Sequence, residues 1–393
     1  NSDLKLRLNI FKIVAANLDM IKTDVKIKNE VNNILLNDLL KYQLNELENL
    51  MIIIVSINNT ETLKKLYESL IVTLNNSEND NKLKKLIISI VSFIIHSNMS
   101  VNSNSIINKL CIIFEKCDSV VIKSIIINQL LKLCNKTPSL YSNTKVLSLL
   151  DNTLLLGNKF NALKKEIVLG LTNYLKIQES NNDDITLNLI VKYTPKVLMM
   201  IIQNDDSMNN IIYKYIKNLV FFKIINPMTY LPYIVPLVIH EKYHIETLDL
   251  EFNDINILSK GTSFMMQSFV MNNNIENLQY YNFVDNLLSL GVDISLILKI
   301  FLKQLKANQK NKLHLIFLTV NILKIVHKFD KSTLKKLIDH VNIIIDGVQR
   351  SDDSDYIQQN QVLRNFLKYL SIQYENNNYV NFEVEDYDFA GLK

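Results

Sequence analysis

Residues 119–156 read SVVIKSIIINQLLKLCNKTPSLYSNTKVLSLLDNTLLL, and this stretch decides the fold. Apolar residues recur at spacings of three and four on both sides of a polar break, which is the pattern of an α-helix with one buried face. The break NKTPSLYSN contains Pro138 and several small polar residues, which favour a turn. The stretch therefore predicts two amphipathic helices joined by a short connection.

The same pattern continues along the chain, for example in ETLKKLYESLIVTL, KLKKLIISIVSFII and NALKKEIVLGLTNYLKI. We expect roughly seventeen or eighteen helices, and pairing them gives a unit of roughly 40 residues, the period of HEAT and armadillo arrays. Only 6 glycines and 5 prolines are present, so few positions suit the tight turns of sheets. We predict an all-α fold, an irregular α-solenoid of HEAT/armadillo-type helical hairpins.

The domain organisation follows from where this pattern changes. We predict one continuous HEAT-repeat solenoid over residues 1–352, as a fragment of a longer chain. Residues 353–393 are expected to form a last amphipathic helix, around Leu363 to Tyr374, and an acidic C-terminal tail containing FEVEDYDFAGLK.

Composition excludes several classes of protein. The formal net charge is +4, so any attraction for nucleic acid must come from a local basic surface. The 3 cysteines contain no C-x-x-C, which argues against a disulfide framework and against a thiolate zinc site. The longest apolar run, residues 86–95, is much shorter than the roughly 20 residues that cross a bilayer, so no membrane contact is expected.

The stretch HEKYH, from His240 to His244, matches the His-Glu-x-x-His signature of zinc peptidases. Such a site needs a third protein ligand, and a metzincin-type continuation is excluded by Thr247 and Leu250. No acidic residue occurs between Asp254 and Glu276, where a glutamate ligand from a following helix would lie. We therefore interpret the motif as an exposed, polar helix end and keep a zinc peptidase as a remote alternative.

Other signatures of enzymes are missing from the sequence. It contains no G-x-G-x-x-G, no Walker loop and no G-x-S-x-G motif. We expect a scaffold without enzymatic activity, without a cofactor and without a metal site.

A basic stripe is the strongest candidate for a binding site. Residues 294–329 contain seven lysines and no acidic residue. Lys299, Lys303 and Lys306, followed by Lys310, have the spacing of one helix face, while Leu298 and Leu302 belong to an apolar face. Such lysines can neutralise DNA phosphates without reading bases; the alternative is an ordinary solvated face. The predicted DNA-binding residues are Lys299, Lys303, Lys306, Lys310 and Lys312.

From about Cys111 to Asp352, the order of segments resembles the C-terminal HEAT-repeat half of the Nipped-B family of cohesin loaders, which includes the fungal sister-chromatid-cohesion loader. The resemblance rests on LLKLCNKTPSLYSN, on NYLKIQES, on INPMTYLPYIVPLVI with Pro227 and Pro232 at the family's proline positions, and on LIDHVNIIIDGVQRS. The family's usual glycine before the first of these prolines is replaced by FFKII, and the first hundred residues match no motif of the family.

The resemblance implies a nuclear, chromatin-bound scaffold that loads cohesin onto chromosomes for sister chromatid cohesion in the cell cycle. It implies binding to the cohesin SMC subunits, to the kleisin and to double-stranded DNA, with stimulation of cohesin ATP hydrolysis. The resemblance also implies a tetratricopeptide partner, which we expect to bind through an N-terminal region that this fragment would lack. The alternative is another cohesin-associated or transport-type HEAT adaptor.

Overall fold

The computed structural model is helical throughout the part of the chain that it describes. It describes residues 14, 17, 21, 26, 41–77, 79–97, 99, 101–177, 184–203, 205–223, 225–240, 243, 245, 252–272, 278–309, 311–348 and 354–375. No β-strand occurs among these residues. None of their helices is long and apolar enough to cross a membrane.

The chain divides into two compact units, Asn1–Ile190 and Val191–Lys393. The helices of the first unit are, in chain order, α4 (Leu47–Ile57), α5 (Thr60–Asn75), α6 (Asp80–His96), α7 (Ser103–Lys116), α8 (Val120–Lys136), α9 (Thr144–Leu154) and α10 (Asn161–Ile177). Helix α11 (Asp184–Met199) contains the boundary between the units.

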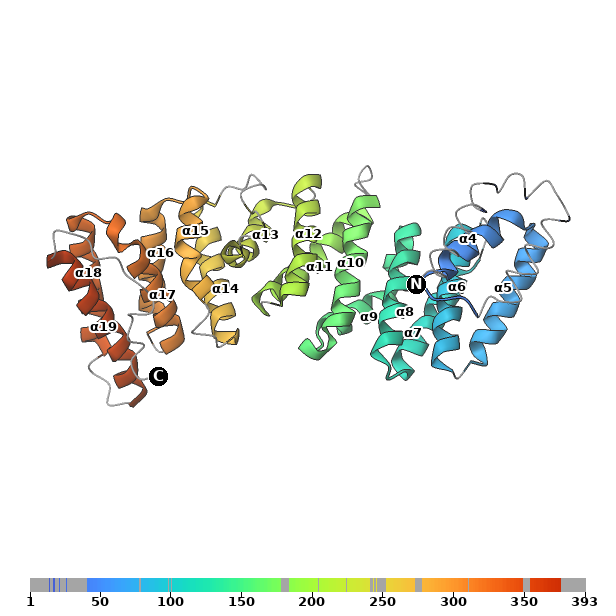
Figure 1. Ribbon diagram of the computed structural model, residues 1–393, viewed down its shortest axis with the longest axis horizontal. Helices are drawn as coiled ribbons and strands as arrows, with labels where there is room; N and C mark the ends of the chain where they lie inside the picture. Colours follow the sequence, from blue (N-terminus) through green and yellow to red (C-terminus); the bar gives the residue numbers. More distant parts are fainter. Residues whose placement is uncertain are drawn as a thin grey trace. The chain divides into compact units, whose positions relative to one another are not determined.

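The second unit continues with the helices α12 (Asp206–Phe222), α13 (Pro227–Ile234), α14 (Ile255–Asn272), α15 (Phe283–Ser289), α16 (Ile294–Ala307), α17 (Lys312–Ile325), α18 (Lys331–Val348) and α19 (Ser354–Glu375). Short 3₁₀ helices connect several of them, including η5 (Val235–Ile239), η8 (Leu278–Asn282) and η9 (Val326–Lys328). Figure 1 shows these helices following one another in chain order.

Helical hairpins stack within the first unit. Helices α4, α6, α8 and α10 pack each on the next, while α5 packs on α6 and α7 packs on α8 and α9. A single hairpin cannot bury its apolar face alone, so each stacks on its neighbour, as in HEAT and armadillo arrays. The predicted all-α class and hairpin architecture are confirmed.

The second unit has the same kind of packing. Helix α17 packs against α14, α15, α16 and α19, and α18 packs against α19. Helix α17 is consequently buried almost all round, with Leu315 to Val320 and Ile322 nearly inaccessible to solvent. Helix α19 extends further in both directions than the predicted helix around Leu363 to Tyr374, and the division at residues 352 and 353 stays a prediction.

Asparagine and aspartate define where many of these helices begin. Their side chains accept hydrogen bonds from backbone N–H groups of the first turn, which have no partner inside the helix. Helices capped in this way include α5, α6, α7, α9, α12, α13, α16 and α17, through Asn59, Asn79, Asn102, Asn143, Asp205, Asn226, Asp293 and Asn311. The asparagine-rich composition therefore supplies the helix ends.

Candidate nucleic-acid interface

Helix α16 holds the first part of the predicted basic stripe. Its buried face consists of Ile297, Ile300, Phe301, Gln304 and Leu305. Lys299, Lys303 and Lys306 are exposed, at spacings of four and three residues. The three ammonium groups therefore lie along one side of the helix, as the sequence predicts.

The predicted helix does not continue to Lys310, however. Helix α16 ends at Ala307, and the side-chain amide of Asn308 donates to the Gln304 carbonyl oxygen at 2.9 Å. The backbone N–H of Asn308 donates to the same carbonyl, so this residue closes the last turn of α16. Because the helix ends before Lys310, the prediction of four lysines on one helix face is wrong. Lys310 lies outside the described residues, and Lys312 is the first residue of α17.

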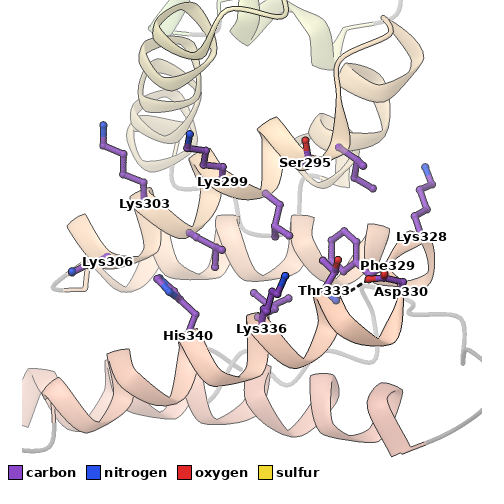
Figure 2. Close-up of a pocket in the computed structure, with 14 residues that line it drawn as sticks. Ser295, Lys299, Lys303, Lys306, Lys328, Phe329, Asp330, Thr333, Lys336 and His340 are labelled. Carbon is purple, nitrogen blue, oxygen red and sulfur yellow. Dashed lines mark hydrogen bonds between the residues drawn. The ribbon is translucent and has the colours of Figure 1, made fainter.

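A groove of about 780 Å³ lies between α16 and the start of α18. Lysines from both helices line it, together with an apolar floor (Figure 2). The floor includes Leu298 and Leu302, which are half-buried, and Phe329 and Leu337, which are buried. We call this feature the basic groove; its lysines are Lys299, Lys303, Lys306, Lys328 and Lys336.

Four of these lysines are available to a ligand. Among the described residues, Lys299, Lys303, Lys306 and Lys336 have no acidic partner within ion-pair distance, and all four are exposed. In Figure 2, Lys299 and Lys303 stand on the rim formed by α16, and Lys336 and His340 point from α18 toward α16. The flexible lysine stems allow the ammonium groups to turn toward an anion.

Asp330 is the acidic residue in the lining, and it is engaged by its own helix. Its carboxylate accepts a hydrogen bond of 2.7 Å from the backbone N–H of Thr333, in the first turn of α18. Hydrogen bonds from the Thr333 side chain and backbone lower the pKa of Asp330 below its ordinary value. The carboxylate therefore caps α18. The positive charge of Lys336 also lowers the pKa of Asp330, although no groove lysine lies within ion-pair distance of its carboxylate.

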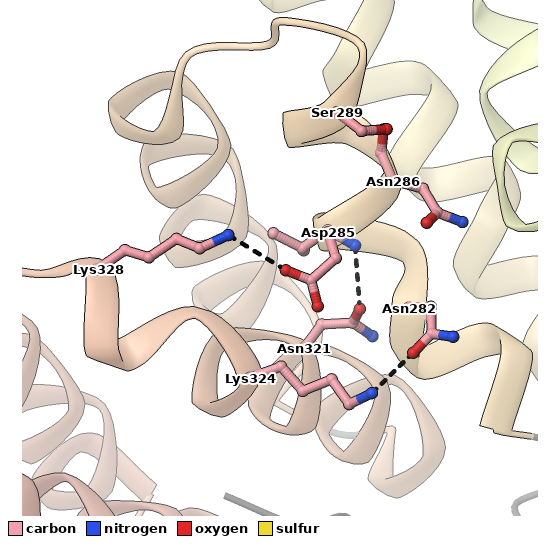
Figure 3. Close-up of polar contacts among 8 residues, drawn as sticks. Asn282, Asp285, Asn286, Ser289, Asn321, Lys324 and Lys328 are labelled. Carbon is pink, nitrogen blue, oxygen red and sulfur yellow. Dashed lines mark hydrogen bonds and ion pairs between the residues drawn. The ribbon is translucent and has the colours of Figure 1, made fainter. Parts of the chain in front are cut away.

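The last two lysines of the acid-free run, Lys324 and Lys328, contact η8 and α15 instead. The Lys324 Nζ donates to the Asn282 Oδ1 at 2.7 Å, and the Lys328 Nζ lies 3.3 Å from the Asp285 carboxylate (Figure 3). Lys324 thus connects α17 to η8, and Lys328 connects η9 to α15. Lys328 lines the basic groove, but its charge is shared with Asp285.

The contribution of α18 to the basic groove was not predicted from the sequence. Lys336 and His340 lie one helical turn apart, a signal that places them on one face of a helix. Nothing in that spacing says that this face meets α16, about 35 residues earlier in the chain. The Nε2 atom of His340 is buried and has no hydrogen-bond partner in the structure.

The zinc-like motif is described only in part, because Glu241 and His244 lie outside the described residues. His240 follows the 3₁₀ helix η5, and neither it nor Tyr243 is α-helical. His240 is only 8% exposed, and its ring packs edge-on against Tyr243 at 5.6 Å. The prediction of an exposed helix end is therefore wrong for His240, which this aromatic contact buries. Among the described residues, no group of three or more His, Cys, Asp or Glu side chains is placed to hold a metal ion.

Comparisons with known proteins agree with the fold. No protein-family model matches the chain, and no curated protein matches it in sequence. The solved structure of the "Chaetomium thermophilum cohesin loader SCC2, C-terminal fragment" is similar, with a TM-score of 0.61 and 10% sequence identity over 92% of this chain. The match spans 34% of the length of that chain. The fold of this protein is therefore similar to that of a helical cohesin-loader fragment, as the sequence resemblance implied.

Proposed function

We propose that this protein is a cohesin-loader-like HEAT scaffold that acts on chromatin in the nucleus. It binds the cohesin SMC subunits, the kleisin and double-stranded DNA, and it stimulates ATP hydrolysis by cohesin without being an enzyme. The observation that carries the proposal is the fold similarity to the cohesin-loader fragment over 92% of this chain. The order of segments that resembles the Nipped-B family supports the same function.

The basic groove is the proposed DNA contact. Its four available lysines, Lys299, Lys303, Lys306 and Lys336, are exposed and form no ion pair with a described carboxylate. Lysine ammonium groups bind phosphate oxygens as point charges and read no base sequence. The proposed contact is therefore independent of DNA sequence and depends strongly on salt, since binding releases condensed counterions.

The test is DNA affinity across a salt series, measured by fluorescence anisotropy with a labelled duplex. In the groove variant, Lys299, Lys303, Lys306 and Lys336 are all changed to Gln. Four lost phosphate contacts should reduce the slope of log K against log salt by about 3.6, since each contributes about 0.9. Between 50 and 200 mM salt, these four contacts alone account for a roughly 150-fold fall in DNA affinity.

The matched control changes the same number of exposed lysines in the first unit. Lys64, Lys116, Lys145 and Lys159 are all exposed and come from four different elements of that unit. Changing them to Gln removes the same net charge, so the control should keep most of the salt slope. Equal losses in the two variants would show that net charge, and not the basic groove, determines the binding.

The cohesin part of the proposal needs a separate assay. We expect the wild-type chain to bind purified cohesin and to raise its ATP hydrolysis in the presence of DNA. A chain that binds DNA but neither binds cohesin nor changes its ATPase rate would contradict the loader proposal and leave only a DNA-binding scaffold.

A further inference from the structure

The basic groove combines two features that favour different parts of one ligand. Its rim carries exposed lysines, whereas its floor is formed by Leu298, Leu302, Phe329 and Leu337. A DNA backbone uses the positive charge but leaves the apolar floor without a contact. A peptide segment that interleaves carboxylates with apolar side chains would use both.

The chain itself contains such a segment. Residues 382–389 read FEVEDYDF and lie outside the described residues. Every acidic residue in this segment is adjacent to an apolar or aromatic one. The acids are Glu383, Glu385, Asp386 and Asp388, so their number matches the four available lysines of the basic groove.

The position of α19 brings this segment within reach of the basic groove. Helices α18 and α19 pack against each other and are joined by residues 349–353, a connection so short that the helices run antiparallel. Their 18 and 22 residues correspond to lengths of about 27 and 33 Å at 1.5 Å per residue. The end of α19 at Glu375 therefore lies beside the start of α18.

The start of α18 is also one end of the basic groove, where Phe329, Asp330 and Thr333 line it (Figure 2). Residues 376–381 connect Glu375 to the acidic segment, and six residues span at most about 20 Å. Packed helices lie about 8–10 Å apart, so this connection is long enough. From Ile294 to Lys306 the groove is about 18 Å long, which accommodates six extended residues. The four acids lie within six residues, 383–388, so Phe382 and Phe389 would lie at the two ends of the groove.

We propose that residues 382–389 bind in the basic groove of the same chain and compete there with DNA. The binding itself stands on charge, apolar contact and reach, while the competition with DNA rests on the proposed function. The carboxylates of this segment form ion pairs with the groove lysines, and its aromatic side chains cover the apolar floor.

The direct test uses a fluorescein-labelled synthetic peptide with the sequence of residues 380–391. It is titrated into three full-length forms: wild type, a segment variant, and the segment variant combined with the groove variant. The segment variant carries Glu383→Gln, Glu385→Gln, Asp386→Asn and Asp388→Asn, so its own segment no longer competes. These substitutions lie outside the described helices.

We expect the segment variant to bind the peptide, and the combined variant to bind at least tenfold more weakly. Wild type should also bind about tenfold more weakly than the segment variant, if the peptide Kd is ~0.1 mM and the tethered segment has an effective concentration of ~1 mM. A peptide with its acids neutralised and a peptide with Phe382, Tyr387 and Phe389 changed to Ser should each lose affinity.

Two results would overturn the proposal. If the segment variant binds no peptide at low salt, the basic groove does not recognise this sequence. If wild type and the segment variant bind the peptide equally well, the segment does not occupy the groove within its own chain. Far-UV circular dichroism of all three forms checks that the groove substitutions leave the helices folded.

A DNA titration separates this proposal from the proposed function. The segment variant should bind duplex DNA about tenfold more tightly than wild type at low salt, for the same effective-concentration reason. If the peptide results hold while no form binds DNA, the segment contact stands and the DNA function of the groove is wrong. If DNA binds both forms equally, competition between the segment and DNA is refuted.

Discussion

The side chain of Asn321 links three elements of the second unit, and its replacement by Leu should destabilise the contact between α15 and α17. Asn321 lies on α17 and is fully buried. Its Oδ1 accepts a hydrogen bond from the Val284 N–H at 3.3 Å, and its Nδ2 donates to the Tyr280 carbonyl oxygen at 3.2 Å. A further bond reaches the Phe317 carbonyl oxygen in its own helix.

The bond to Val284 replaces a missing helix cap. Asn282 precedes α15 but makes no side-chain capping bond, because its Oδ1 accepts from Lys324 instead (Figure 3). The N–H groups of a first helical turn have no partner within the helix. Asn321 therefore caps α15 from a neighbouring helix, and Leu, of similar size, removes the cap without leaving a large cavity.

The magnitude follows from the two bonds between elements. Val284 and Tyr280 are completely buried, so their backbone groups would lose a partner without gaining water. An unsatisfied buried donor or acceptor costs about 1–3 kcal/mol, and the apolar Leu side chain offsets part of this. We expect a net destabilisation of about 2–4 kcal/mol, which is a roughly 30- to 1,000-fold larger population of the locally open state.

Hydrogen exchange followed by mass spectrometry measures this effect where it occurs, in peptides covering residues 278–290. A matched control is Asn311→Ala, which removes the ordinary cap of α17, a bond of 3.1 Å from the His314 N–H. Loss of this cap should lower the free energy of unfolding by about 1 kcal/mol. If Asn321→Leu changes exchange of residues 278–290 by less than the control does, capping from α17 does not stabilise α15.

Two further predictions concern packing and buried thiols. A Cβ atom at Gly261 would lie 2.5 Å from the Val235 Cβ, which is too close for two carbon atoms that are not bonded. Gly261→Ala should therefore lower the free energy of unfolding by about 1–3 kcal/mol, as measured by thermal unfolding. Adding Val235→Ala should restore part of this stability. Burial raises the pKa of the Cys111 thiol to about 11. Burial, together with the nearby Cys111, raises the pKa of the Cys134 thiol to about 12. The third cysteine, Cys117, is partly exposed. A thiol reagent at pH 8 should therefore label one cysteine quickly in the native protein and all three after unfolding. Because the folded pKa values lie above the ordinary value of 9.0, the unfolded chain loses these protons first. This contribution to stability should be intact below pH 9 and decrease as pH rises toward 11, which urea midpoints at pH 8 and 10.5 would measure; equal midpoints would contradict it.

The amino-acid sequence determined the helices of this protein. Residues 119–156 form α8 and α9 with a break at Pro138, as their apolar spacing predicts. Asn143 accepts from the Lys145 N–H at the start of α9. Spacing and capping act over three or four residues, so they can be read from a short stretch of chain.

Tertiary structure decided the basic groove. Sequence placed Lys299, Lys303 and Lys306 on one helix face but extended that helix to Lys310, beyond the actual end at Ala307. Lys336 enters the groove from α18 only because the connections and the packing around α17 bring two distant surfaces together. Local spacing fixes which residues share a helix face, whereas contacts between helices fix which faces meet, and the latter depend on side chains far apart in the sequence.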